Sequence, residues 1–206
     1  MLFLTKRIFL IICFIIDFPL ILLTWLEALI GGKNQEHIFC SCRDILSICP
    51  TFIGIYLRKA FYWAVCTDVS PDVHFLFGSW LSHRQNIIRS GVVVGHYSFI
   101  GYADIGKNVL MAARVSIVSG KYQHGRPQQR THPGRVIEEY TTINIGENTW
   151  IGQDVTILAN IGKNCTVGAG SVVFRVVPDN TTVLGNPARK VNLDYIAKDK
   201  DNNCTG

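Results

Sequence analysis

The side chains best suited to acid–base chemistry lie on one long polar segment, residues 119–140. This segment carries His124 and His132 among two prolines, three glycines and three arginines, and it holds almost no apolar side chains. An imidazole with its ordinary pKa of about 6.5 can accept a proton at neutral pH, so either histidine could act as a general base. Long polar excursions are usually functional or disordered, and an ordinary solvent-exposed histidine is the alternative for both.

A second group of residues is suited to binding an anion. The run Gly168–Ser171 offers backbone donors and no bulky side chains, so an extended ligand could approach the main chain closely. Arg175, Arg189 and Lys190 follow, and their cationic groups could neutralise phosphates through charge-assisted hydrogen bonds. Ordinary solvated surface is the alternative for these three cations.

The elements that must position these residues are indicated by a six-residue period. A branched aliphatic residue recurs at this spacing, usually followed by glycine, and this pattern predicts a parallel β-helix in which the aliphatic residue points inward. A small residue after it lets the chain turn where a Cβ would crowd the backbone. The repeats are Ile145-Gly146, Ile151-Gly152, Ile157-Leu158, Val167-Gly168 and Val173-Phe174, with one slip at Ile161-Gly162.

The repeat divides the chain into four predicted parts. Residues 67–191 form the all-β solenoid, with an excursion loop at 119–140, and residues 192–206 form a polar tail. Residues 33–66 hold a linker and amphipathic or capping helices. We expect residues 31–42 to be a polar linker and residues 51–65 to be one of the helices. Aromatic residues beside basic ones suit a membrane interface there, whereas an exposed solenoid end also needs a cap.

Residues 1–32 are predicted to form a membrane-associated apolar helix. The apolar run from Ile8 to Ile30 has about the ~20 residues that a spanning helix needs. However, Asp17 would be costly at the centre of a bilayer, and Pro19 removes a backbone donor and kinks a helix. A spanning helix, a re-entrant helix and an interfacial helix therefore all remain open.

Composition excludes one class of partner and indicates a compartment. The net charge is +5, but lysine and arginine are scattered, without the basic stripe and interleaved aromatics of a nucleic-acid-binding surface. The seven cysteines are odd in number and form no CxxC pair, which favours free thiols in a reducing compartment. We therefore expect no nucleic acid partner and a catalytic domain on the cytoplasmic face of a membrane.

Together these motifs resemble the hexapeptide-repeat acyltransferase superfamily, most closely its sugar and xenobiotic O-acetyltransferase-like branch. The resemblance covers residues 69–191 and includes the excursion with its histidine. It rests also on the runs Asn148–Gly152, Val167–Val173 and Gly185–Arg189. It implies a left-handed β-helix, a homotrimer with sites between subunits, and acetyl transfer from acetyl-CoA to a hydroxyl of a sugar or glycan. The apolar N-terminus departs from the soluble members.

The resemblance also implies roles for single residues. His124 would be the catalytic base that deprotonates the acceptor, without a covalent intermediate, and no metal would be needed. Ala169 and Arg175 match positions that contact CoA. Ser171, Arg189 and Lys190 join them as cofactor-binding residues because of their residue types and positions. Trp150 would line the cleft between donor and acceptor, or else shield a coil corner. His83 would face the acceptor, or else be hydrogen-bonded within a turn.

Three other interpretations stay open. An N-acetyltransferase acting on an amino sugar would use the same base and site. A non-catalytic, membrane-bound β-helix could instead scaffold a glycan-assembly complex. A metalloenzyme like the γ-class carbonic anhydrases needs a closely spaced histidine pair, which His83, His96, His124 and His132 do not provide. Within the acyltransferase interpretation, the short link at residues 158–160 puts the shape of the neighbouring cofactor groove in doubt.

Overall fold

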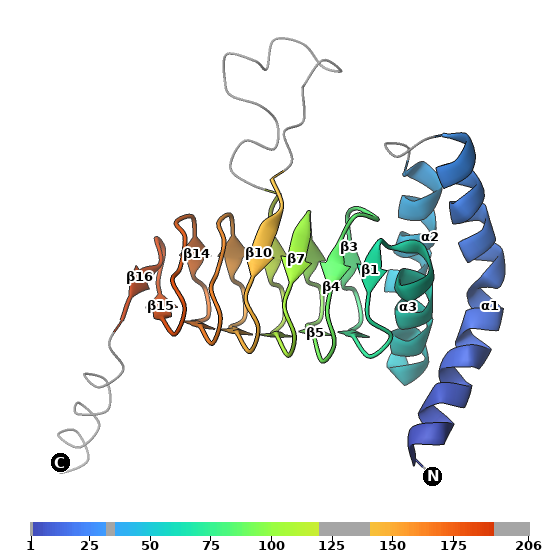
Figure 1. Cartoon of the computed structure of the whole chain (residues 1–206), viewed down its shortest axis with the longest axis horizontal. Coiled ribbons are helices and arrows are strands. Elements are labelled where there is room, and N and C mark those ends of the chain that lie inside the picture. Colours follow the sequence, from blue (N-terminus) through green and yellow to red (C-terminus); the bar gives the residue numbers. More distant parts are fainter. Residues whose placement is uncertain (1, 32–35, 120–140, 192–206) are drawn as a thin grey trace.

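Three helices precede a three-sided β-solenoid in this chain (Figure 1). The computed structural model describes residues 2–31, 36–119 and 141–191. The helices are α1 (Leu2–Ile30), α2 (His37–Ser47) and α3 (Thr51–Val65). α1 continues through Pro19 as one helix, and α2 begins inside the stretch that we expected to be a polar linker.

The solenoid consists of three parallel sheets, one on each side of a prism. Sheet A contains β1 (Asp68–Val69), β4 (Ile87–Ile88), β7 (Ala103–Ile105) and β10 (Ile143–Ile145). Sheet B contains β2 (His74–Phe75), β5 (Val93–Val94), β8 (Leu110–Met111), β11 (Trp150–Ile151), β13 (Thr166–Val167), β15 (Thr182–Leu184) and the antiparallel β16 (Arg189–Lys190). Sheet C contains β3 (Trp80–Leu81), β6 (Phe99–Ile100), β9 (Ser116–Ile117), β12 (Thr156–Ile157) and β14 (Val172–Val173).

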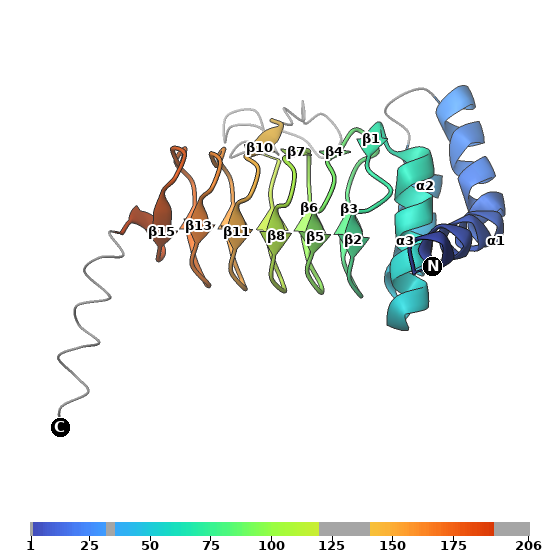
Figure 2. The ribbon, with the colours of Figure 1, turned by 60° about the horizontal axis from the view of Figure 1, so that its bottom comes forward.

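Each coil visits sheets A, B and C in turn and then stacks on the coil before it. Ile151 of β11 thus pairs with Val167 of β13, which in turn pairs with Val183 of β15. Figure 2 shows the strands of sheet B standing in one row along the prism. The chain therefore forms a left-handed parallel β-helix of about five coils, which confirms the fold class expected from the six-residue period.

The interior of the prism is a continuous aliphatic column. Ile145, Ile151 and Ile157, one from each sheet of the same coil, are almost completely buried. Steric crowding explains why glycine follows such a residue. A Cβ on Gly146, for example, would lie 2.4 Å from the backbone carbonyl carbon of Gly162 on the next coil. The predicted role of the small residue is confirmed at this position.

The slip in the period at residues 158–160 is a regular feature of the fold. The corner from sheet C to sheet A is short: Ile157 and Ile161 are four residues apart, and so are Val173 and Val177. Ile145, Ile161 and Val177 consequently stack as single parallel bridges along sheet A. The segment 120–140 leaves the solenoid at this same corner, between β9 and β10.

A ladder of asparagines closes another corner, from sheet A to sheet B. Asn108, Asn148, Asn164 and Asn180 all have a positive φ, which asparagine tolerates better than most residues. Each amide donates to the next along the ladder, over 3.1, 3.2 and 3.1 Å. These side chains satisfy one another while the backbone turns.

The helices cap the N-terminal end of the solenoid. Arg58 of α3 is fully buried and donates to the carbonyl oxygens of Phe75 on β2 (3.0 Å) and of Leu46 in α2 (2.8 Å). Arg43 of α2 donates to the carbonyl of Leu81 on β3 at 3.1 Å, and its guanidinium lies over Trp80. Exposed coil ends need such a cap, so the capping role considered for this region is observed.

Candidate active site

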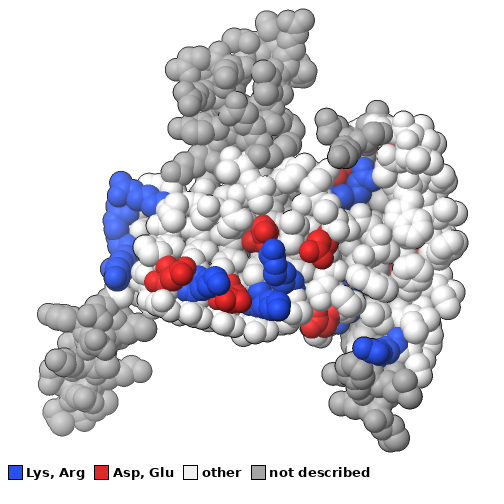
Figure 3. All heavy atoms as spheres, in the orientation of Figure 1, with Lys and Arg blue, Asp and Glu red and all other residues white. Residues whose placement is uncertain are grey.

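Three of the residues expected to bind a cofactor meet at the C-terminal end of the solenoid. Arg175 lies in the short corner after β14, and the β15–β16 hairpin turns Arg189 and Lys190 back over the last coil. All three line one hollow of about 200 Å³, together with apolar residues that include Phe174 and Val176. Lysine and arginine side chains dominate this end of the molecule (Figure 3).

This basic hollow has the chemistry of an anion site. Two guanidinium groups and an ammonium group can hold phosphate oxygens by charge-assisted hydrogen bonds, and arginine can do so with two parallel bonds. The Arg175 guanidinium lies 5.6 Å from the centre of the Phe174 ring, so a flat apolar surface adjoins the charge. A ligand with both phosphates and an apolar portion would match this end of the solenoid.

The run Gly168–Ser171 lies at the corner from sheet B to sheet C. Ala169 is exposed there, next to the exposed Gly170, for which an added Cβ would meet no atom within 4 Å. Ser171 is buried, and its hydroxyl accepts a hydrogen bond from the Gly185 amide at 3.0 Å. The Ser171 side chain thus holds this corner against Gly185, which lies in the turn between β15 and β16.

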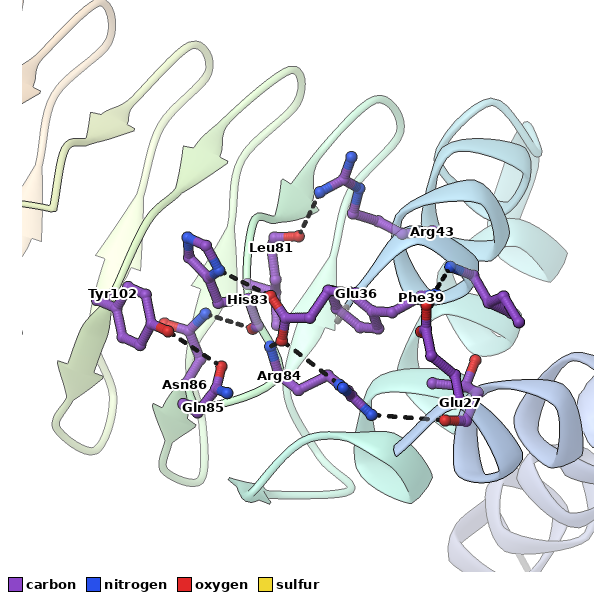
Figure 4. Close-up of polar contacts among 12 residues, drawn as sticks. Glu27, Glu36, Phe39, Arg43, Leu81, His83, Arg84, Gln85, Asn86 and Tyr102 are labelled. Carbon is purple, nitrogen blue, oxygen red and sulfur yellow. Dashed lines mark hydrogen bonds and ion pairs between the residues drawn. The ribbon is translucent and has the colours of Figure 1, made fainter. Parts of the chain in front are cut away.

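His83 lies at the corner from sheet C to sheet A, directly after β3. Its Nδ1 atom is 2.8 Å from Oε2 of Glu36, and Oε1 of the same carboxylate accepts the Arg84 amide at 2.9 Å (Figure 4). The imidazole stacks on the ring of Tyr102, with centroids 4.2 Å apart. The helical cap therefore supplies a carboxylate that orients a solenoid histidine.

The electrostatics of this group favour an ionised carboxylate. Burial of Glu36 on its own would raise its pKa. The hydrogen bonds from His83 and the Arg84 amide, with the charge of His83, outweigh burial and lower the pKa below its ordinary value. The Arg84 guanidinium adds a longer contact of 3.4 Å to the same oxygen. Glu36 is thus held as an acceptor for both neighbours.

The root of the excursion lies at the same corner as His83. Ser119 accepts a hydrogen bond from the Tyr102 amide through its hydroxyl, at 2.8 Å, and one from the Thr141 amide through its carbonyl, at 3.0 Å. Tyr102 thus contacts both His83 and the start of the excursion. His124 and His132 lie on the excursion itself, outside the described residues.

Comparison with known proteins identifies the family. The family model described as "Bacterial transferase hexapeptide (six repeats)" matches residues 136–175. The Saccharomyces cerevisiae protein named "Putative acetyltransferase YJL218W" is 39% identical over 151 residues, which are 72% of this chain and 67% of that protein. The chain belongs to the hexapeptide-repeat acetyltransferase superfamily.

Two further relatives of this chain are also named as O-acetyltransferases. The galactoside O-acetyltransferase of Escherichia coli K12 is 33% identical over 129 residues, covering 60% of this chain and 59% of that protein. The lipopolysaccharide biosynthesis O-acetyl transferase WbbJ of the same bacterium, itself named as putative, is 34% identical over 101 residues, covering 46% and 52%. The matched segments therefore span between about half and two thirds of these relatives.

A solved structure shows the same fold. The crystal structure of a maltose O-acetyltransferase from Clostridium difficile 630 superposes with a TM-score of 0.58 at 24% identity, over 81% of this chain and 88% of that one. It supports the solenoid architecture of this hexapeptide-repeat acetyltransferase.

Trp150, which we predicted to line the cleft between donor and acceptor, lies on another side of the prism. Trp150 projects from sheet B with 46% of its surface exposed, between Leu110 and Thr166 of the neighbouring strands. Sheet B does not border the corner between sheets C and A, which carries His83 and the root of the excursion at Ser119. One protomer therefore does not bring Trp150 and the excursion root together.

Two contributors to the His83 corner were not foreseen from the sequence. Glu36 precedes α2 and is 47 residues away from His83, and nothing in its local sequence distinguishes it from a solvated charge. Tyr102 stands two residues after Ile100 of the six-residue repeat, which would have marked it only as a corner residue. Among residues 2–31, 36–119 and 141–191, no three His, Cys, Asp or Glu side chains gather as metal ligands.

Proposed function

We propose that this chain transfers an acetyl group from acetyl-CoA to a hydroxyl of a sugar or glycan. The observation that carries this proposal is the basic hollow of Arg175, Arg189 and Lys190 at the end of an acetyltransferase-family solenoid. The O-acetyltransferases among the relatives support the hydroxyl as acceptor. An amine of an amino sugar could attack the thioester from the same site, but no feature of this chain favours it.

In this proposal the residues divide the work between donor and acceptor. The three cations would hold the phosphates of acetyl-CoA, and the exposed Ala169 would let the pantetheine arm pass close to the backbone, at a corner that the buried Ser171 supports through its bond to Gly185. His124 takes the proton of the acceptor hydroxyl as that oxygen attacks the thioester carbonyl, and the thiolate of CoA leaves as the tetrahedral intermediate collapses. No covalent intermediate with the protein is needed.

His83 is proposed to hold the acceptor. Its Nδ1 atom engages Glu36, so the orientation of the ring is fixed and Nε2 is directed away from the helical cap (Figure 4). Stacking on Tyr102 places the ring beside the root of the excursion that carries His124. An acceptor hydrogen-bonded at this corner would lie within reach of a base on that segment.

The site is proposed to form between subunits of a homotrimer. Trp150 and Ala169 lie away from the corner that carries His83 and the excursion, so a complete site needs these surfaces from different copies. A cyclic trimer of parallel solenoids would place the excursion corner of one copy against sheet B of the next, which is a heterologous contact that closes on itself.

We also propose that the chain associates with a membrane, with its catalytic domain on the cytoplasmic face. The apolar α1 supports association, and the six cysteines among the described residues, all free thiols, support a reducing compartment.

Thermal unfolding with CoA ligands tests the donor site. Acetyl-CoA at about 100 times its Kd should stabilise the chain by about 2.7 kcal/mol, and removal of the 3′-phosphate should reduce this gain. Arg189→Ala should remove most of the shift, whereas Arg89→Ala, which breaks an ion pair with Asp104 on sheet A, should keep it. No shift with any CoA ligand would contradict the donor assignment.

A further inference from the structure

The cap of the solenoid exposes an unusually apolar surface. On α1, Ile15 and Ile16 are 66% and 60% exposed, and α2 and α3 also expose apolar residues, such as Ile45 and Phe52. Soluble monomers rarely expose an apolar patch of more than a few hundred Å² unless it is an interaction site. We call this surface the outer cap face; on α1 it comprises Ile8, Ile11, Ile12, Ile15, Ile16, Phe18, Leu22, Leu23, Trp25, Leu26, Leu29 and Ile30.

The polar side chains of α1 point the other way. Asp17, Thr24 and Glu27 are 2%, 0% and 8% exposed. The Glu27 carboxylate accepts the backbone amides of Ile38 and Phe39, at 2.7 and 3.0 Å, where α2 begins. Burial raises the pKa of Asp17 to about 7, which lowers the cost of keeping it inside. One side of α1 therefore packs against the rest of the protein, and the exposed side is purely apolar.

Three observations identify a lipid bilayer, rather than another protein, as the occupant of this face. Residues 8–30 contain no lysine, arginine or histidine, and both of their carboxylates are buried, so the outer cap face of α1 offers no charge to a protein partner. The indole of Trp25 donates to the Ala64 carbonyl at 3.1 Å, so its exposed part is carbon. An apolar groove between α1 and α3 is lined by Leu10, Phe14 and Trp63 and also by Arg7, a combination that suits a lipid with an anionic headgroup.

We infer that α1 lies in the plane of an anionic membrane surface and does not cross it. From Arg7 to Ile30 the helix is long and apolar enough to span a bilayer. Along its length, however, it packs on α3 and α2, and Phe9 and Phe14 contact Tyr56 and Trp63. Figure 1 shows α1 running across the end of the solenoid. An upright α1 would carry α2, α3 and the end of the solenoid into the hydrocarbon region.

The in-plane orientation of α1 also restricts the class of acceptor that can reach the site. This step rests on the proposed function and makes it more specific. His83 is joined directly to Glu36 at the start of α2, so the acceptor corner adjoins the membrane-facing cap. Neighbouring coils are only about 4.8 Å apart, which keeps the excursion root close to the same surface. The acceptor class is therefore a glycan attached to a membrane lipid.

Flotation of the full chain with vesicles tests whether the outer cap face binds a lipid bilayer. The vesicles contain about three parts phosphatidylcholine to one part phosphatidylglycerol. Ile15→Glu and Ile16→Glu should each lower the partition coefficient by about tenfold or more, as expected for losing one buried aliphatic side chain. Val176→Glu, which alters an exposed aliphatic residue at the opposite end of the solenoid, should leave it unchanged. Equal binding by all variants, or self-association through this face without vesicle binding, would overturn the inference.

The side of the membrane on which each end of the chain lies distinguishes an in-plane α1 from a membrane-spanning α1. Epitopes at the two ends of the chain, probed with protease in sealed vesicles, should both be accessible from the same side. Protection of the N-terminal epitope alone would show a spanning α1 and overturn the inference while leaving membrane association intact. The thermal shift with acetyl-CoA, measured in parallel, reports on the proposed donor site independently, because that site lies at the opposite end of the solenoid from the helical cap.

Discussion

His124 is the residue on which catalysis depends most in our proposal. His124→Ala should lower kcat by about 10²–10⁴-fold, the usual contribution of a general base, while the Kd for acetyl-CoA stays nearly unchanged. Steady-state kinetics and calorimetric titration of the same preparation would measure both. His132→Ala is the matched control on the same segment and should keep kcat within a few-fold. A reversed pattern would move the base to His132.

Glu36 should influence both stability and acceptor binding through His83. Glu36→Gln removes the charge from an acceptor of several hydrogen bonds. A hydrogen bond to a charged group typically contributes about 1.5–3 kcal/mol to the free energy of unfolding, so the substitution should destabilise the chain at neutral pH. Because the folded-state pKa of Glu36 is lowered, this stability is present above the ordinary pKa and is lost as pH falls through the folded value. Urea unfolding of both proteins in a series from pH 7 downward should show a difference at pH 7 that fades as the pH falls.

A purely structural Glu36 would change stability alone. In our proposal Glu36→Gln also raises KM for the acceptor and leaves KM for acetyl-CoA unchanged, since the donor cations lie at the opposite end of the solenoid. An unchanged acceptor KM would remove Glu36 and His83 from the site.

Residue chemistry was only partly predictable from the sequence. Arg175, Arg189 and Lys190 are separated by up to 15 residues, yet the six-residue period places them near one end of a prism, where the structure joins them in one hollow. Glu36 could not be nominated, because its contact with His83 depends on how a helical cap docks onto a solenoid. That docking is set by buried groups such as Arg58, whose partners are backbone carbonyls without any sequence signature.

At the scale of the repeating coil, glycine is required for close approach of backbones. Gly146→Ala would place a Cβ 2.4 Å from the backbone of the next coil, which cannot move aside as a side chain could. We expect a loss of about 1–3 kcal/mol in the free energy of unfolding, the usual cost of overpacking.

Gly170→Ala is the matched control for this prediction. Its added Cβ meets no atom within 4 Å, so it carries only the cost of a positive φ, about 1 kcal/mol. Chemical denaturation would compare the two variants. A smaller loss for Gly146→Ala than for Gly170→Ala would contradict the steric explanation of the glycines in the repeat.

The elements themselves show where sequence patterns succeed and fail. The six-residue period predicted the solenoid because each inward aliphatic residue is buried by its own coil and its neighbours, a regularity that survives in the sequence. The apparent defect at residues 158–160 is a short corner that recurs after Val173, and only the stacked strands reveal it. The start of α2 at His37 was missed because polar residues precede it and recur within it, and because the burial of Phe39 comes from packing against Phe61 of α3, which the local sequence does not indicate.

At the scale of the whole molecule, the division of site residues between sides of the prism predicts complementation. His124→Ala and Trp150→Ala protomers should each form impaired trimers. If they are unfolded, mixed in equal amounts and refolded, about a quarter of the clefts should combine an intact His124 with an intact Trp150, since each cyclic contact draws one side from each of two copies. Activity well above that of either variant is expected, and no recovery in verified mixed trimers would place both residues in one protomer's site.

Acetyl transfer itself is the most direct test of the central claim. The full chain, incubated with acetyl-CoA and a panel of glycans, should add the mass of an acetyl group to a sugar hydroxyl, with one CoA thiol released per acetyl group transferred. Intact-mass spectrometry of the acceptors and a thiol assay would follow both products. Binding of acetyl-CoA without transfer to any lipid-linked or soluble glycan would contradict the claim and favour a non-catalytic solenoid.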